Sequence, residues 1–178
     1  MVKYKILTLL INLIGGTAVL GSYIWGFQAR PEAADLLWGG VPESLRPAYT
    51  AGMFLAATGY FLFSYFILFR LNAAETRIAG RWGYGTFNLL YALILVPSAL
   101  WLPLTFLAVD QASPALVWLV RLDLALVALA SIGLLFSLLW LQPRQPRWAH
   151  RLAMLGALGF CFQTVLLDAI VWGANFGV

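Results

Sequence analysis

This chain has few charged side chains, and their scarcity excludes several classes of protein. Charged residues make up 10% of its 178 residues, whereas apolar and aromatic residues make up 62%. Soluble domains typically contain about 25% charged and about 45–50% apolar residues. So few charged groups cannot cover the core of a water-soluble fold of this length, so long stretches are expected to face lipid. The composition excludes a soluble enzyme, a nucleic-acid-binding domain and a disordered tail.

Cysteine, histidine and lysine are also rare, which narrows the possible chemistry further. The single cysteine, Cys161, excludes an intrachain disulfide and a thiolate metal cluster. The single histidine, His150, excludes bis-histidine haem ligation and a zinc site formed by this chain alone. The only lysines, Lys3 and Lys5, precede the first apolar run, so no buried lysine is present to form a retinal Schiff base. No metal site is predicted.

Five apolar stretches are each long enough to cross a bilayer, for which a helix needs about 20 residues. The segments between them are short and rich in proline, glycine, arginine and acidic residues, which leaves no room for a soluble domain. The whole chain, residues 1–178, is therefore predicted to form a single transmembrane domain, an all-α bundle of five helices. The predicted helices span residues 6–27, 48–70, 85–108, 114–140 and 152–174.

The positions of the basic residues predict the orientation of these helices in the membrane. The N-terminus and the second and fourth connections together contain most of the basic residues: Lys3, Lys5, Arg70, Arg77, Arg81, Arg144, Arg147 and Arg151. The opposite side has Arg30 and Arg46, offset by acidic residues. Because basic loops stay in the cytoplasm, the N-terminus is expected to be cytoplasmic and the C-terminus outside.

Three ionisable side chains lie within the apolar runs: Arg121, Asp123 and Asp168. Such groups are costly in hydrocarbon, so they usually face the interior of a bundle. Arg121 and Asp168 lie roughly 10 Å and 9 Å from the outer boundary on consecutive antiparallel helices, which predicts an ion pair between them. Asp123 does not share the face of Arg121, and its partner is not predicted. The pair either only locks two helices together or also lines a ligand cavity.

Prolines and glycines within the apolar runs predict kinks and close helix contacts. Pro97 and Pro103 interrupt the third predicted helix beside Trp101 and Phe106. This segment either forms one wall of a pocket or is kinked for packing alone. The glycines inside the first and fifth predicted helices are expected to allow close helix contact: Gly15, Gly16, Gly156 and Gly159.

Most tryptophans lie near the ends of the predicted helices, which is typical of the aromatic belt at the lipid headgroups. They are Trp25, Trp38, Trp118 and Trp172 on the outer side, and Trp82, Trp140 and Trp148 on the inner side.

Four short runs of the sequence are similar to motifs of one known family. They are Gly15–Gly16 in the first predicted helix, Pro47-Ala48-Tyr49-Thr50-Ala51-Gly52 in the second, Trp101-Leu102-Pro103-Leu104-Thr105-Phe106 in the third, and Leu167-Asp168-Ala169-Ile170-Val171-Trp172-Gly173-Ala174-Asn175 in the fifth. They resemble a glycine pair and the Pro-x-Trp-x-x-Gly, Trp-x-Pro-x-x-Phe and Leu-Asn-Tyr-x-x-Trp-x-x-Asn patterns of the translocator protein family, also called tryptophan-rich sensory proteins or peripheral-type benzodiazepine receptors. The resemblance spans nearly the whole chain.

Several departures fall on positions that belong to the binding cavity of that family. The tandem proline before the second helix is reduced to Pro47, preceded by Arg46. The expected tryptophan of the second helix falls near Leu55, and the Asn-Tyr pair of the fifth helix becomes Asp168-Ala169. The resemblance therefore implies a retained fold with a changed ligand, because the family's cavity, closed by its tryptophan-rich first loop, holds tetrapyrroles, sterols or synthetic ligands.

The resemblance implies a membrane protein that binds a hydrophobic or amphipathic ligand, such as a porphyrin, a sterol or another lipid, in a pocket within the bundle that opens to the outer side. No cofactor is required beyond such a bound tetrapyrrole, sterol or lipid, and no acid/base pair indicates an enzyme. The predicted lining residues are Trp38, Tyr49, Trp101, Phe106, Arg121, Asp123 and Asp168.

Two other functions remain open at this stage. The chain is also compatible with an accessory subunit of a larger photosynthetic or respiratory membrane complex, where its aromatic residues would contact pigments or partner helices. A small transporter fits less well, because an odd number of helices without a repeat does not suit an inverted-repeat mechanism. The expected partners are membrane lipids, a hydrophobic small molecule, and either a second copy of the chain or a larger membrane complex.

Overall fold

The computed structural model describes residues 2–30 and 32–177, and it confirms an all-α bundle of five long helical segments. Each segment is long and apolar enough to cross a membrane, so we describe the chain as an integral membrane protein. The segments are α1 (Val2–Ala29), α3 (Arg46–Tyr65) with its π-helical continuation η2 (Phe66–Arg70), α4 (Gly85–Asp110), α5 (Pro114–Leu139), and α6 (Arg147–Cys161) with the π-helical η3 (Phe162–Trp172) and the final turn α7 (Gly173–Asn175).

The observed helix limits extend beyond some of the predicted ones. The first helix begins at Val2 rather than at residue 6, and the last begins at Arg147 rather than at residue 152. Apolar composition marks where the chain lies in hydrocarbon, whereas a helix continues into the polar boundary as long as its backbone geometry allows. Pro146 precedes α6 in an extended conformation (φ −71°, ψ 142°), and the helix begins at the next residue, Arg147.

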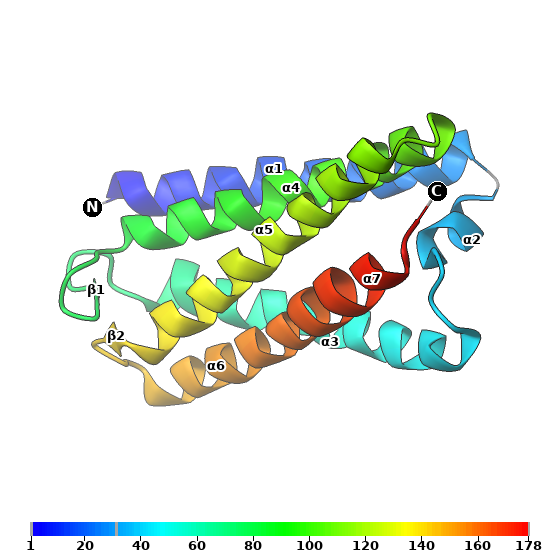
Figure 1. Ribbon diagram of the computed structural model, residues 1–178. Coiled ribbons are helices and arrows are strands. Elements are labelled where there is room, and N and C mark those ends of the chain that lie inside the picture. Colours follow the sequence, from blue (N-terminus) through cyan, green and yellow to red (C-terminus); the bar gives the residue numbers. More distant parts are fainter. Residues whose placement is uncertain (1, 31, 178) are drawn as a thin grey trace.

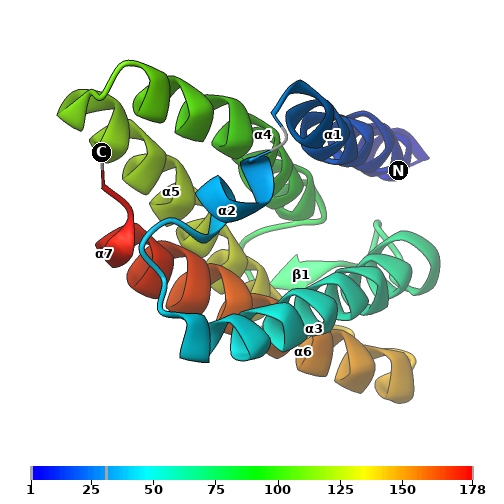
Figure 2. The ribbon, with the colours of Figure 1, turned by 90° about the vertical axis from the view of Figure 1, so that its right-hand side faces the viewer.

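The five segments pack side by side around a common interior (Figure 2). The largest contacts join α1 to α4, α4 to α5, α5 to α6 and η3, and α6 to α3. In this arrangement the first and second membrane segments, α1 and α3, are not joined by one of these large contacts. Around the interior, the helices therefore follow one another in the order α1, α4, α5, α6 with η3, and α3.

Four short elements complete the fold, and the sequence did not predict them. The strands β1 (Arg77–Ile78) and β2 (Leu141–Gln142) pair antiparallel, with Ile78 opposite Leu141. This pairing brings the α3–α4 and α5–α6 connections together at the end where the chain begins (Figure 1). The helix α2 (Ala33–Trp38) and the turn η1 (Glu43–Leu45) lie at the opposite end, near α7.

Close contact between α3 and α6 depends on glycine. A Cβ atom at Gly156 would lie 2.6 Å from the carbonyl oxygen of Gly59, and a Cβ atom at Gly59 would collide with the backbone of Gly156. A Cβ atom at Gly159 would collide with the Leu55 side chain of α3, and a Cβ atom at Gly15 would collide with the Leu95 side chain of α4. Close contact is thus confirmed for the predicted glycines Gly15, Gly156 and Gly159. The prediction was wrong for Gly16, where a Cβ atom would meet no described atom within 4 Å.

The half of the bundle next to the β1–β2 pair is closed by aromatic and polar side chains. The Tyr60 hydroxyl donates to Asn12 Oδ1 at 2.5 Å and so links α3 to α1. The Tyr91 hydroxyl donates to Ser64 Oγ at 2.8 Å and links α4 to α3. Tyr91 and Phe63 are fully buried and adjacent. Because these hydroxyl groups are hydrogen-bonded, they can be buried in an apolar interior without a large desolvation cost.

Large apolar side chains cover the outside of the bundle. Phe54 and Phe61 on α3 are each 72% exposed, and Ile14 and Leu129 on other helices are similarly exposed. A water-soluble monomer rarely exposes a continuous apolar surface of this kind. The outer surface therefore fits contact with lipid.

Candidate functional site

The half of the bundle beneath α2 contains a cavity of about 520 Å³. Side chains from α1, α3, α4, α5, α6 with η3, and α2 line it, so it occupies the centre of the bundle. This volume lies within the range of about 300–1,000 Å³ that is usual for small-molecule sites. The cavity is the best-formed candidate site in the part of the chain that the structure describes.

Aromatic rings from six different segments line the cavity. They are Tyr23, Phe27, Trp38, Tyr49, Trp101, Phe160 and Trp172. The centroid of the Trp101 ring lies 6.1 Å from that of Tyr23 and 5.4 Å from that of Trp172, at an interplanar angle of 71° to the latter. Trp38 and Tyr49 meet edge to face with centroids 6.1 Å apart. Rings in such contacts present broad apolar faces that suit a flat hydrophobic ligand.

The helix α2 lies across one end of the bundle (Figure 2). Its residues line the cavity there, and specific contacts hold it in place. The indole Nε1 of Trp172 donates to the carbonyl oxygen of Leu37 at 2.8 Å, which ties α2 to the end of η3. Ala33 is fully buried in a cluster with Leu102. Gly39 ends α2 with φ +54°, a conformation that L side chains rarely adopt, and this turn lets the chain leave α2 beside Trp172.

The polar end of the cavity is formed by Gln163 and Asp168 of η3. Gln163 Nε2 donates to Asp168 Oδ1 at 2.7 Å. Gln163 is 6% exposed, and its Oε1 is buried without a hydrogen-bond partner among the described residues. Next to them, the Tyr49 hydroxyl donates to the carbonyl oxygen of Leu167 at 2.5 Å. The cavity therefore combines a large aromatic surface with a polar end formed by Gln163 and Asp168.

The floor of the cavity is Phe160, which separates it from the closed half of the bundle. Its ring lies 5.5 Å from Phe63, nearly perpendicular to it, and 6.2 Å from Tyr60. Beside it, Thr164 Oγ1 and Ser131 Oγ are 2.7 Å apart and share a hydrogen bond between η3 and α5. A ligand in the cavity would thus rest on a rigid aromatic layer.

The predicted ion pair between Arg121 and Asp168 is not formed. In the described part of the chain the salt bridges join Arg30 to Asp110 and Arg46 to Glu43. Arg121 Nη2 instead donates to the carbonyl oxygen of Phe176 at 3.0 Å, and its guanidinium lies 5.0 Å from the centre of the Trp118 ring.

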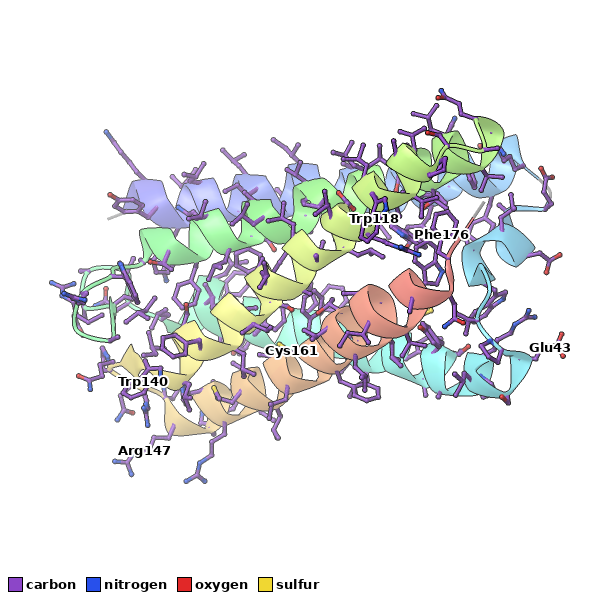
Figure 3. The ribbon with its side chains drawn as sticks, in the orientation of Figure 1. Glu43, Trp118, Trp140, Arg147, Cys161 and Phe176 are labelled. Atoms are coloured by element: carbon purple, nitrogen blue, oxygen red, sulfur yellow. The ribbon has the colours of Figure 1, made fainter. Side chains whose placement is uncertain are left out.

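The direction of the Arg121 side chain explains why the pairing prediction was wrong. The prediction compared only how deep Arg121 and Asp168 lie in the membrane. It did not consider the carbonyl groups at the end of the last helix, which have no partner within the helix and can accept a hydrogen bond from Arg121. One of these, on Phe176, accepts the guanidinium hydrogen bond. Figure 3 places Trp118 and Phe176 at the same end of the molecule, where Arg121 reaches both.

Two further predicted lining residues also lie elsewhere. Phe106 packs against Trp25, with ring centroids 5.8 Å apart, and beneath the guanidinium of Arg30. It follows Trp101 by five residues, which places it about 140° further around the helix. Asp123 is not among the lining residues, and its Oδ2 is buried without a hydrogen-bond partner in the described part of the chain.

Four predicted residues do line the cavity: Trp38, Tyr49, Trp101 and Asp168. Sequence reasoning missed Tyr23 and Gln163, and it placed Trp172 in the aromatic belt. The position of Trp172 was accessible from the sequence, because it follows Asp168 by four residues and so shares its face. Gln163 is a polar residue within an apolar run, which was also a usable signal. Tyr23 carries no such signal.

Comparisons with protein-family models, with curated proteins and with solved structures give no match to this chain.

Proposed function

We propose that this protein binds a hydrophobic or amphipathic small molecule, such as a tetrapyrrole, a sterol or another lipid, in the cavity beneath α2. The observation that carries this proposal is the cavity of about 520 Å³, with its aromatic walls and its single polar end. A site of this kind buries most of a small ligand in apolar contacts, while a few polar groups fix its orientation.

The resemblance to the translocator protein family supports the same function. In that family the first loop closes over the ligand, and here the first loop forms α2, whose Leu37 and Trp38 line the cavity. Tyr49, Trp101 and Asp168 come from the runs that resemble family motifs, and all three line the cavity. Two of them, Tyr49 and Asp168, stand where the family has a different residue, so the proposal includes a ligand that differs from the usual ones.

The proposed orientation places the cavity at the outer face of the membrane. The basic residues predict a cytoplasmic N-terminus. The β1–β2 pair lies at the N-terminal end of the bundle, and α2 lies at the other end (Figure 1). With the N-terminus inside, α2 and the cavity mouth beneath it would face the outside.

Protoporphyrin binding by the purified full-length protein tests the proposal. Protoporphyrin is expected to quench tryptophan fluorescence saturably. Trp101→Leu should lower its affinity by about fivefold, since one aromatic contact contributes about 1 kcal/mol. The affinity is read from the fluorescence of the porphyrin itself, so that loss of Trp101 is not mistaken for loss of signal.

Trp140→Leu provides the matched control, because Trp140 is half-exposed at the opposite end of the bundle and should leave the affinity unchanged. Quenching that does not saturate, or an equal effect of the two substitutions, would count against a tetrapyrrole in this cavity. Co-purification in mild detergent at fixed stoichiometry with a large membrane complex would favour the accessory-subunit function instead.

A further inference from the structure

The cavity is lined by one carboxyl group, and no basic side chain of the described residues lines it to balance that group. Asp168 is its single acidic lining residue, and within the described chain no lysine, arginine or histidine lines it. Arg121, which the sequence predicted as the partner of Asp168, instead donates to the carbonyl oxygen of Phe176 and lies over the Trp118 ring. A ligand therefore meets a carboxyl group that has no cationic partner from the described protein.

The hydrogen-bonding capacity of this region is also unbalanced. The side-chain amide of Gln163 donates a hydrogen bond to Asp168 Oδ1, so this carboxyl oxygen already has a donor. Gln163 Oε1 is buried without a hydrogen-bond partner among the residues that the structure describes, and so is the indole Nε1 of Trp101 elsewhere on the cavity wall. Buried acceptors without a donor are costly, and they are rare in folded proteins. Beside Gln163 the missing component is a donor, and the cavity is the space from which one can be supplied.

The aromatic walls suit a donor that is also positively charged. The faces of tyrosine and tryptophan rings attract cations, and this attraction strengthens when water is excluded. Tyr23, Tyr49, Trp101 and Trp172 line the same cavity as Asp168. An aromatic enclosure with one carboxyl group at its end is the arrangement that recognises an organic ammonium group, whereas it repels a ligand that presents a carboxylate at that end.

We propose that the ligand of this cavity is a hydrophobic amine, whose ammonium group binds Asp168 and Gln163 while its apolar body lies against the aromatic walls. This inference rests on the proposed ligand-binding function and specifies the chemical class of the ligand. A tetrapyrrole can then bind only with its carboxylates directed away from Asp168, so it should bind more weakly than an amine of similar size.

Three probes with one aromatic skeleton test the inference: 1-pyrenemethylammonium, 1-pyrenemethanol and 1-pyrenecarboxylate. Binding to the full-length protein in lipid nanodiscs is measured as saturable energy transfer from tryptophan to pyrene, with empty nanodiscs correcting for partition into lipid. The ammonium probe should bind at least about tenfold more tightly than the alcohol, because a charge-assisted hydrogen bond is roughly twice as strong as a neutral one. The carboxylate should bind most weakly.

The isosteric substitution Asp168→Asn should reduce the affinity for the ammonium probe to about that for the alcohol, and it should change the affinity for the alcohol less than twofold. Glu43→Gln is the matched control, since it removes an exposed carboxylate at the same end of the molecule, outside the cavity. The order of the three affinities in the wild-type protein needs no variant, so the test stands even if Asp168→Asn does not fold.

The outcomes separate this inference from the function on which it rests. Saturable binding of all three probes with equal affinity, or with the carboxylate preferred, would overturn the amine assignment and leave ligand binding intact. Absence of saturable binding by any probe would overturn both. A preference for the ammonium probe that Asp168→Asn leaves unchanged would also overturn the assignment, because the carboxyl group would then not be its partner.

Discussion

Individual side chains determine the shape of the cavity mainly through hydrogen bonds to the backbone. Trp172 donates to the carbonyl oxygen of Leu37, Tyr49 donates to that of Leu167, and Arg121 donates to that of Phe176. In each case a long side chain satisfies a carbonyl group on another segment. These contacts position α2 and the end of the last helix, and they leave Asp168 free to face the cavity.

Trp172→Phe should loosen α2 without emptying the aromatic wall. It removes the indole N–H that donates to Leu37 but keeps an aromatic ring, so it should cost about 1 kcal/mol of local stability. Amide hydrogen exchange in residues 33–41 should accelerate by about fivefold. The matched substitution Trp140→Phe, at the other end of the bundle, should leave that exchange unchanged. An equal rate in the two variants would show that the Trp172 hydrogen bond does not hold α2.

At the scale of elements, α3 and α6 meet backbone to backbone. Gly59 and Gly156 bring the two backbones together, and Gly52 lies beside Gln163 and Leu167. The polar end of the cavity is thus positioned by the same pair of helices that meets at the glycines. A change in the separation of these helices should therefore affect stability and site together.

Gly59→Ala is expected to destabilise the bundle. Its Cβ atom would collide with the backbone of Gly156, which cannot rotate away as a side chain could. Overpacking of this kind costs about 1–3 kcal/mol. Thermal unfolding in detergent should show a lower midpoint for Gly59→Ala than for the wild type.

Gly16→Ala is the control for this substitution, because no atom of the described residues lies within 4 Å of a Cβ at that position. It should leave the midpoint unchanged or raise it, since alanine favours a helix more than glycine does. If both substitutions shifted the midpoint equally, helix propensity rather than close packing would explain the effect.

The sequence predicted the long helices well and the site only partly, for identifiable physical reasons. Apolar runs of about 20 residues leave few alternatives to membrane helices, so α4 was predicted from 85 to 108 and ends at Asp110. The helix α2 was missed because six residues carry too little periodicity to distinguish a helix from a loop. The pairing of β1 with β2 joins residues about 60 positions apart and has no local signal.

The errors within the site have a similar origin. Depth along a helix follows from counting residues, whereas the direction of a side chain around the helix depends on its neighbours. Arg121 and Asp168 were matched in depth, but the carbonyl group of Phe176 lies within reach of Arg121 and takes its hydrogen bond. Phe106 was grouped with Trp101 because it belongs to the same motif, although the helical repeat places it on another face.

At the scale of the whole molecule, the bundle is closed at one end and hollow at the other. Tyr60, Phe63 and Phe160 fill the half near the β1–β2 pair, and the cavity occupies the half beneath α2. The basic connections lie at the closed end, with Trp140 and Arg147 opposite Glu43 (Figure 3). A ligand would therefore enter from the α2 end or from the surrounding lipid.

Cysteine accessibility should reveal the proposed orientation. In a Cys161→Ser background, a membrane-impermeant thiol reagent should label cysteines introduced at Glu43 and Gln111 in intact cells. Cysteines at Glu75 and Gln145, which are also exposed, should be labelled only after permeabilisation. The reverse pattern would contradict the orientation. Labelling of the cysteines at Glu75 and Gln145 on opposite faces would contradict the fold as well.

The most direct test of ligand binding within the bundle is native mass spectrometry of the protein purified in mild detergent without added ligand. We expect one small molecule bound per chain. It should be lost in Ala56→Phe, which fills the cavity from α3, and retained in Ile14→Phe, which changes a lipid-facing position on α1. A wild-type protein without any bound molecule, or a molecule retained equally by both variants, would contradict the account.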